Sequence, residues 1–98
     1  MLERTYQAKL IKKLRLMFPG CVVLKNDPNY IQGFPDLLVL IGDRWFALEV
    51  KVRRQAAVRP NQEYYVDLLD NLSFAAFIYP ENEEDVLDEI QRSLNLSG

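Results

Sequence analysis

The chain has 98 residues, of which 49% are hydrophobic and 27% are charged, a balance typical of one globular domain rather than of a disordered segment. It has no histidine and one cysteine, which excludes His-based triads, His general bases and His- or Cys-based zinc sites. The net charge of −2 hides an asymmetry, because residues 1–60 carry 11 Lys and Arg against 5 Asp and Glu, whereas residues 61–98 carry 1 against 9. The basic half can face a polyanion, or the asymmetry can be a chance division between two solvated faces.

The longest apolar run, residues 74–79, has six residues, whereas a helix that spans a bilayer needs about 20. No charged start followed by an apolar stretch marks a secretion signal. Cys21 has no partner for an internal disulfide, which suits a reducing compartment. We therefore expect a cytoplasmic protein with no membrane partner.

Hydrophobic spacing, Pro and Gly positions predict the elements along the chain. In order, we expect a helix over 2–17, a strand over 21–24, a polar loop over 26–34, a strand over 36–41, a turn at 42–43, a strand over 44–52, a helix from 60, a strand over 74–79 and a last helix from 83. The order αβββαβα predicts a single α/β domain over residues 1–98, with a mixed central sheet flanked by helices.

The two later helices have recognisable starts and apolar faces. Pro60 suits the first position of a helix, and Asn82 suits a cap before an acidic first turn. The predicted core-facing residues of these two helices are Tyr65, Val66, Leu69 and Leu72, followed by Val86, Leu87, Ile90 and Leu94.

The strand predicted over 44–52 places charges on a face that should be apolar. Alternation puts one set of residues on the core side, namely Phe46, Leu48, Val50 and Val52. The opposite side then carries Trp45, Ala47, Glu49, Lys51 and Arg53. The bland interpretation is a salt-bridged ladder on a half-exposed strand.

The hairpin register favours a different interpretation. A two-residue turn at Gly42-Asp43 pairs Ile41 with Arg44, so that paired residue numbers sum to 85 and Asp36 lies opposite Glu49. Facing carboxylates destabilise a sheet unless a positive charge lies between them. A divalent cation with oxygen ligands supplies that charge, and paired carboxylates with room for water suit Mg²⁺. The constellation therefore predicts a metal site beside Lys51.

Pro35-Asp36, twelve residues, and then Glu49-Val50-Lys51 resembles the PD-(D/E)XK motif of metal-dependent nucleases, whose core is a restriction-endonuclease-like αβββαβ fold. Here a C-terminal helix would follow that core. Further matches are similar to the VRR-NUC branch: Glu3 with Gln7 in the first helix, the stretch 32–36, and Gln62 at the start of the next helix. The chain departs from that branch at Arg59, where Ser or Thr is more typical.

The resemblance implies a Mg²⁺-dependent endonuclease, with Mn²⁺ also accepted and no small-molecule cofactor. Asp36, Glu49 and the Val50 carbonyl would hold the metal, and Lys51 would orient water or neutralise charge on the phosphate. Glu3 and Gln62 would complete the catalytic set. Helical spacing places Glu3 on a stripe that faces the sheet, although Glu3 can also be a favourable first-turn acid and Gln62 a capping amide.

Phosphate contacts are expected from basic residues of the first 60, namely Lys9, Lys12, Lys13, Lys25, Arg53, Arg54 and Arg59. The resemblance implies branched DNA such as four-way junctions as substrate, a homodimer, and a bacterial or phage-infected cell. Tyr30 and Phe34 can touch a base or a partner, or simply pack. The alternative function is a catalytically silent module with the nuclease fold that binds nucleic acid or a partner protein.

Overall fold

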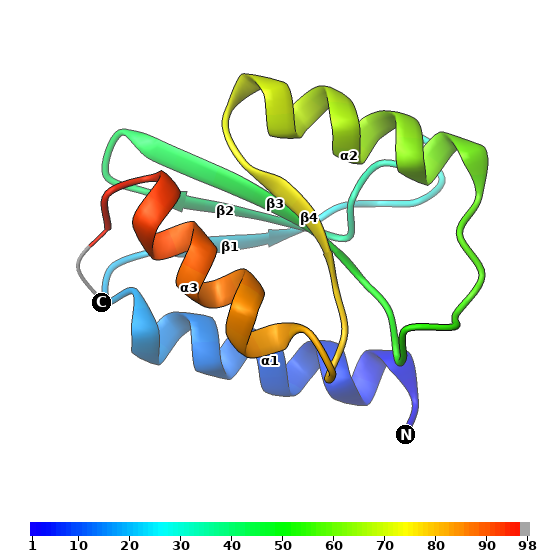
Figure 1. The fold of residues 1–98 in the computed structure, drawn as a ribbon, viewed down its shortest axis with the longest axis horizontal. Helices are drawn as coiled ribbons and strands as arrows, with labels where there is room; N and C mark the ends of the chain where they lie inside the picture. Colours follow the sequence, from blue (N-terminus) through cyan, green and yellow to red (C-terminus); the bar gives the residue numbers. More distant parts are fainter. Residues whose placement is uncertain (97–98) are drawn as a thin grey trace.

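The computed structural model describes residues 1–96 and contains a four-stranded mixed sheet with helices on both faces (Figure 1). The elements in chain order are α1 (Glu3–Met17), β1 (Val22–Lys25), β2 (Leu37–Ile41), β3 (Arg44–Val50), α2 (Pro60–Leu72), β4 (Ala75–Ile78) and α3 (Glu83–Ser93). The predicted order αβββαβα is confirmed, and the protein belongs to the α/β class. None of the helices within residues 1–96 combines the length and apolar character that crossing a membrane requires.

The strands lie in the order β1-β2-β3-β4, with β1–β2 and β2–β3 antiparallel and β3–β4 parallel. Helix α2 is the crossover between the two parallel strands, as parallel neighbours require. Ile41 pairs with Arg44 and Leu37 with Leu48, so the predicted register is confirmed. Gly42 has φ of 58°, the left-handed conformation that a two-residue hairpin turn needs.

Helix α2 covers one face of the sheet, and α1 and α3 cover the other (Figure 1). Each face has its own apolar layer. On one face, α1 and α3 pack on Phe46, Leu48 and Val50 of β3, which are fully buried as predicted. On the other face, α2 packs through Val66 and Leu69. The small side chains of Ala47 and Ala75 let α2 approach β3 and β4 closely. Because both faces of β3 are covered, any polar group on its α2 side is removed from water.

Strand ends differ from the predictions by one or two residues. The third strand ends at Val50 rather than at residue 52, although the Lys51 N–H still donates to the Ile78 carbonyl at 2.9 Å. Val52 lies beyond the strand and is half-buried rather than in the core. The first strand begins at Val22 and the second at Leu37, so Cys21 and Asp36 precede their strands.

The predicted starts of the later helices are confirmed, but one predicted core residue is wrong. Leu72, the last residue of α2, is exposed. Asn82 is the N-cap residue of α3, although its side chain makes no capping hydrogen bond. Its amide instead accepts from the Tyr79 N–H at 2.8 Å and donates to the Phe77 carbonyl at 3.0 Å, which closes the turn after β4.

Candidate active site

Asp36 and Glu49 meet because the hairpin register brings them together. One step beyond the Leu37–Leu48 pair, the same register places Asp36 opposite Glu49. The Val50 N–H donates to Asp36 Oδ2 at 2.9 Å, which fixes the carboxylate at the end of β3. The predicted pair therefore comes from the start of β2 and the end of β3.

Pro35 leaves the Val50 carbonyl without a donor from the neighbouring strand. The register places residue 35 opposite Val50, and proline has no N–H to donate to the Val50 carbonyl. The Pro35 carbonyl is also engaged, since it accepts from Asn26 Nδ2 at 2.6 Å. The Val50 N–H consequently turns to Asp36, and its carbonyl receives no donor from residue 35. A proline at this position releases a backbone oxygen beside the two carboxylates.

Gln62 connects Glu49 to Lys51. Its Nε2 donates to Glu49 Oε2 at 3.1 Å, and its Oε1 accepts from Lys51 Nζ at 3.0 Å. Lys51 Nζ also lies 3.8 Å from Glu49 Oε2. The amide satisfies an acid and a cation at once, which only a group with both a donor and an acceptor can do.

The N-terminus of α2 holds Gln62 in place. Gln62 Oε1 also accepts from the Arg59 N–H at 3.0 Å, so the residue fills the predicted capping position as well as the site. The Arg59 side chain has no acceptor atom and cannot supply the reciprocal bond that Ser or Thr would make. Gln62 therefore occupies the capping position and also contacts Glu49 and Lys51.

Burial makes the carboxylates unusually basic. Glu49 is only 3% exposed and Lys51 only 8%. Burial, followed by the nearby charge of Asp36, raises the pKa of Glu49 to about 8. Burial also raises the pKa of Asp36, although the hydrogen bond from Val50 opposes this shift. Two adjacent carboxyl groups that resist ionisation create a site that favours a proton or a cation.

Glu3 differs from its prediction. Glu3 begins α1 and is exposed, so it does not face the sheet as its helical spacing predicted. Partial burial, followed by the charge of Asp36, nevertheless raises its pKa, and Lys51 opposes this. Glu3 therefore lies within electrostatic reach of the site, at its solvent edge.

Asp36, Glu49 and Gln62 open into a cleft of about 510 Å³. Its remaining walls are the polar loop before β2 and the start of α2, with Pro28, Asn29, Gln32, Gly33, Phe34, Arg59, Pro60 and Asn61. Phe34 anchors the loop to α2, since its ring centroid lies 5.4 Å from that of Tyr65. Phe34 thus packs within the protein, whereas Tyr30 is exposed.

The loop contributes contacts that the sequence did not predict. Asn26 holds Pro35 through its side chain, and its N–H donates to the Asp36 carbonyl at 2.9 Å. Gly33, within the stretch 32–36 that resembles the nuclease branch, lies against α2, where a Cβ would clash with Asn61 Cβ and come within 3.0 Å of the Gln62 nitrogen. For Asn26, the turn-forming composition of the loop was the only signal.

Gly33→Ala is expected to destabilise the protein by roughly 2–4 kcal/mol, because the new methyl group displaces the start of α2 and the backbone is held at positive φ. Gly20→Ala is the matched control. Gly20 has φ of 87°, close to the 86° of Gly33, but nothing lies within 4 Å of the position that its Cβ would take. Urea unfolding of both variants separates the clash from the backbone strain. Equal losses of stability would contradict the close approach.

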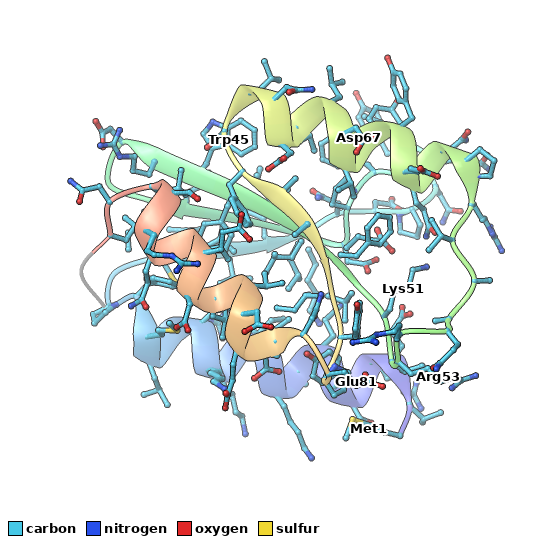
Figure 2. The ribbon with its side chains drawn as sticks, in the orientation of Figure 1. Met1, Trp45, Lys51, Arg53, Asp67 and Glu81 are labelled. Atoms are coloured by element: carbon cyan, nitrogen blue, oxygen red, sulfur yellow. The ribbon has the colours of Figure 1, made fainter. Side chains whose placement is uncertain are left out.

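The basic residues divide into two groups. Arg53, Arg54 and Arg59 are exposed on or beside the segment between β3 and α2, and Arg59 lines the cleft. Figure 2 shows Lys51 and Arg53 at the end of the molecule where Met1 lies. Lys25 ends β1 and pairs with Leu37, the residue that follows Asp36. Lys9 and Lys12 are exposed on α1, one or more turns from Glu3.

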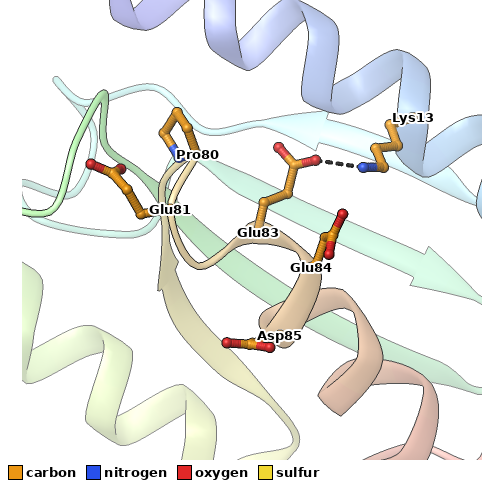
Figure 3. A pocket seen from close by; sticks show the side chains of 6 residues that line it. All are labelled: Lys13, Pro80, Glu81, Glu83, Glu84 and Asp85. Atoms are coloured by element: carbon orange, nitrogen blue, oxygen red, sulfur yellow. Dashed lines mark hydrogen bonds and ion pairs between the residues drawn. The ribbon is translucent and has the colours of Figure 1, made fainter.

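Lys13, which is predicted to contact phosphate, forms an ion pair within the protein. Its Nζ donates to Glu83 Oε2 at 2.6 Å (Figure 3). The Tyr6 hydroxyl donates to Glu83 Oε1 at 2.7 Å. Burial acts to raise the pKa of Glu83, but the hydrogen bonds from Lys13 and Tyr6 outweigh it and lower that pKa. This contact ties α1 to the acidic start of α3.

Lys13→Ala is expected to leave DNA affinity unchanged and to reduce stability by at most about 1 kcal/mol, because the ion pair is half-exposed. Arg53→Ala provides the comparison, since loss of a phosphate contact reduces the slope of log affinity against log salt by about 1. Filter binding at several salt concentrations measures both. A reduced slope for Lys13→Ala would show that this lysine contacts DNA.

Within residues 1–96, no cluster of three or more His, Cys, Asp or Glu side chains forms a ready metal cage. The oxygen set is therefore two carboxylates and a backbone carbonyl, with Glu3 at the edge. Comparison of the chain with protein-family models, curated proteins and solved structures finds no match.

Proposed function

We propose that this protein is a metal-dependent endonuclease of the PD-(D/E)XK type, close to the VRR-NUC branch, that hydrolyses DNA phosphodiester bonds. One observation carries the proposal. Asp36, Glu49 and Gln62, from beside the start of β2, the end of β3 and the start of α2, line one cleft, and Lys51 contacts two of them, Gln62 and Glu49. Their resemblance to the nuclease motif rests on sequence alone, so their convergence is a separate support.

The residues fit a divalent cation with a preference for oxygen. Asp36, Glu49 and the Val50 carbonyl would hold it, and the raised pKa of both carboxyl groups reflects a site short of positive charge. Mg²⁺ keeps several water ligands and needs only one or two carboxylates, whereas an all-protein cage is unnecessary. When bound, Mg²⁺ or Mn²⁺ would supply Lewis-acid stabilisation of the phosphate and a more acidic water.

Lys51 and Gln62 act together on the protein side. Lys51 Nζ presents positive charge beside Glu49 and can orient a water or stabilise charge that develops on the phosphate. Gln62 is a positioning residue, because it holds both the Lys51 ammonium and the Glu49 carboxylate. The histidine-free chain thus assigns proton and charge handling to an amine, an amide and carboxylates.

DNA is proposed to be recognised by its shape. Arg53, Arg54 and Arg59 are exposed near the cleft and suit phosphate contacts, which position DNA without reading its bases. Branched DNA such as a four-way junction is the proposed substrate, in keeping with the resemblance. The cell compartment proposed is the cytoplasm of a bacterial or phage-infected cell.

Cleavage of end-labelled four-way junction, linear duplex and single strand tests the function in Mg²⁺, in Mn²⁺ and in EDTA. We expect metal-dependent cutting, fastest on the junction. Faster cutting of duplex would retain the nuclease and overturn the substrate. Tight binding without cutting in either metal would favour the silent module instead.

A further inference from the structure

A second pocket lies next to the candidate cleft, in the segment between β1 and β2. Its volume is about 340 Å³. We call it the loop pocket, and its lining consists of Asn26, Asp27, Tyr30, Ile31 and Phe34. Pockets for small ligands run from about 300 to 1,000 Å³. The loop pocket is at the lower end of this range, so it suits one compact group rather than a length of nucleic-acid backbone.

Tyr30 presents its ring to water at the loop pocket. This residue is 85% exposed although it lines the pocket. Ile31 and Phe34, in contrast, are half-buried and supply apolar walls. An exposed aromatic ring beside apolar walls provides a surface on which a second flat ring can stack.

Hydrogen bonds within the protein hold the loop in this shape. The Tyr30 N–H donates to the Asp27 carbonyl at 3.1 Å, and the Asn29 N–H donates to Asp27 Oδ1 at 2.8 Å. Where the loop meets the sheet, the Asn26 N–H donates to the Asp36 carbonyl at 2.9 Å. A pocket that is already formed loses little free energy to ordering when a ligand binds.

The loop pocket and the candidate cleft share a wall. Phe34 lines both of them and precedes Asp36 by two residues. Its contact with Tyr65 fixes the loop against α2, and Figure 1 shows this loop alongside the first half of that helix. A group bound in the loop pocket would therefore lie beside a phosphate held in the candidate cleft.

Charge decides which part of a DNA strand suits the loop pocket. Among residues 1–96, the side chains that line it include the Asp27 carboxylate but no lysine or arginine. A carboxylate repels phosphate and accepts hydrogen bonds from N–H groups. A nucleobase is uncharged, has two flat faces for stacking and can carry N–H donors at its edge. The pocket therefore favours a base over the backbone.

We propose that the loop pocket binds one unpaired nucleobase, stacked on Tyr30, next to the phosphate that is cut. This inference rests on the proposed function, because the base belongs to the DNA strand that crosses the candidate cleft. Taking a base out of a duplex costs free energy, and the cost is least for a base that is already unpaired. The protein would thus select DNA with an unpaired nucleotide at the cleavage position, whatever the base, since stacking tolerates every base.

Binding of three end-labelled DNAs in EDTA tests the stacking. They are a duplex with a single bulged nucleotide, the same duplex with an abasic bulge, and the fully paired duplex. Tyr30→Ala should weaken binding of the bulged duplex about tenfold, because it removes one base–aromatic stack, and should leave the other two affinities unchanged. Tyr30→Phe keeps the ring and should bind like the wild type. Tyr64→Ala is the control, since Tyr64 is 62% exposed on α2, outside both pockets.

Cleavage in Mg²⁺ tests where the base is held. When the bulge is moved along the duplex, the cut should move with it, because Phe34 lies between the loop pocket and the candidate cleft. A cut that stays in place while the bulge moves would overturn the proposed position of the base.

Three binding results would overturn the base pocket: equal affinity of the wild type for the bulged and abasic duplexes, wild-type affinity of Tyr30→Ala for the bulged duplex, or an equal loss by Tyr30→Ala on all three DNAs. Each of these results is compatible with metal-dependent cutting, so the nuclease would stand. A protein that prefers the bulged duplex through Tyr30 but never cuts would keep the base pocket and support the silent module. Failure to bind any of the three DNAs would reject both proposals.

Discussion

Lys51→Ala is expected to lower the rate of DNA cleavage by at least about 100-fold while DNA affinity changes little. The ammonium lies beside Glu49 and is held by Gln62, and the side chain is buried, so its positive charge acts through little water. It therefore stabilises negative charge that develops on the phosphate more strongly than an exposed lysine would. Binding should persist, because the proposed phosphate contacts come from exposed arginines such as Arg53.

Single-turnover cleavage at saturating DNA measures this effect without a contribution from affinity. Arg53→Ala gives the opposite pattern, with weaker binding and an unchanged rate at saturation. Lys51→Arg keeps the charge and is expected to recover part of the rate. A Lys51→Ala protein that cuts at the wild-type rate would remove this residue from the mechanism.

Glu49→Gln is expected to stabilise the metal-free protein at pH 8. The pKa of Glu49 is about 8 in the fold and near its ordinary value of 4.5 in the unfolded chain. Between these values the native state binds more protons than the unfolded state, so stability falls as pH rises. The raised pKa of Asp36 acts in the same direction. Removing the Glu49 charge should flatten this decline, and the amide introduced at position 49 can still accept from Gln62.

Thermal unfolding in EDTA between pH 5 and pH 8 measures the slope. Glu89→Gln, an exposed acid on α3, is the control and should keep the wild-type slope. Mg²⁺ should raise the melting temperature of the wild type at pH 8 more than that of Glu49→Gln, because a ligand of the native state stabilises it. A wild-type melting temperature that rises from pH 5 to pH 8 would contradict the raised pKa.

The meeting of Asp36 and Glu49 was predictable because a two-residue turn fixes register. The sum of 85 needs only the position of Gly42-Asp43, and pairing then follows by counting. The faces of β3 were equally predictable, since strand alternation has a period of two. The order of elements followed from apolar spacing and from Pro and Gly.

Contacts between distant segments were not predictable. The hydrogen bonds of Gln62 with Glu49 and Lys51 depend on where the crossover helix begins, and no local pattern fixes that distance. The pairing of Lys13 with Glu83 likewise depends on how α1 meets α3. A basic residue therefore looked free in the sequence although the fold neutralises it.

The sequence also predicted too much burial. The strand at residues 36–41 is almost wholly apolar, which favours cover on both faces, yet Leu40 is exposed. Leu72 was predicted to face the core from its helical spacing, but it ends α2, where the helix no longer covers it.

Asp36 and Glu49 are proposed to hold a divalent cation that the cleavage of DNA requires. The most direct measurement is the single-turnover cutting of a labelled four-way junction in Mg²⁺ and in EDTA. It compares wild type with Asp36→Ala and with Asp43→Ala. Asp43 is an exposed residue of the turn between β2 and β3. We predict cutting by wild type and Asp43→Ala in Mg²⁺ only, and none by Asp36→Ala. Equal cutting by Asp36→Ala, or cutting in EDTA, would contradict the proposed metal site.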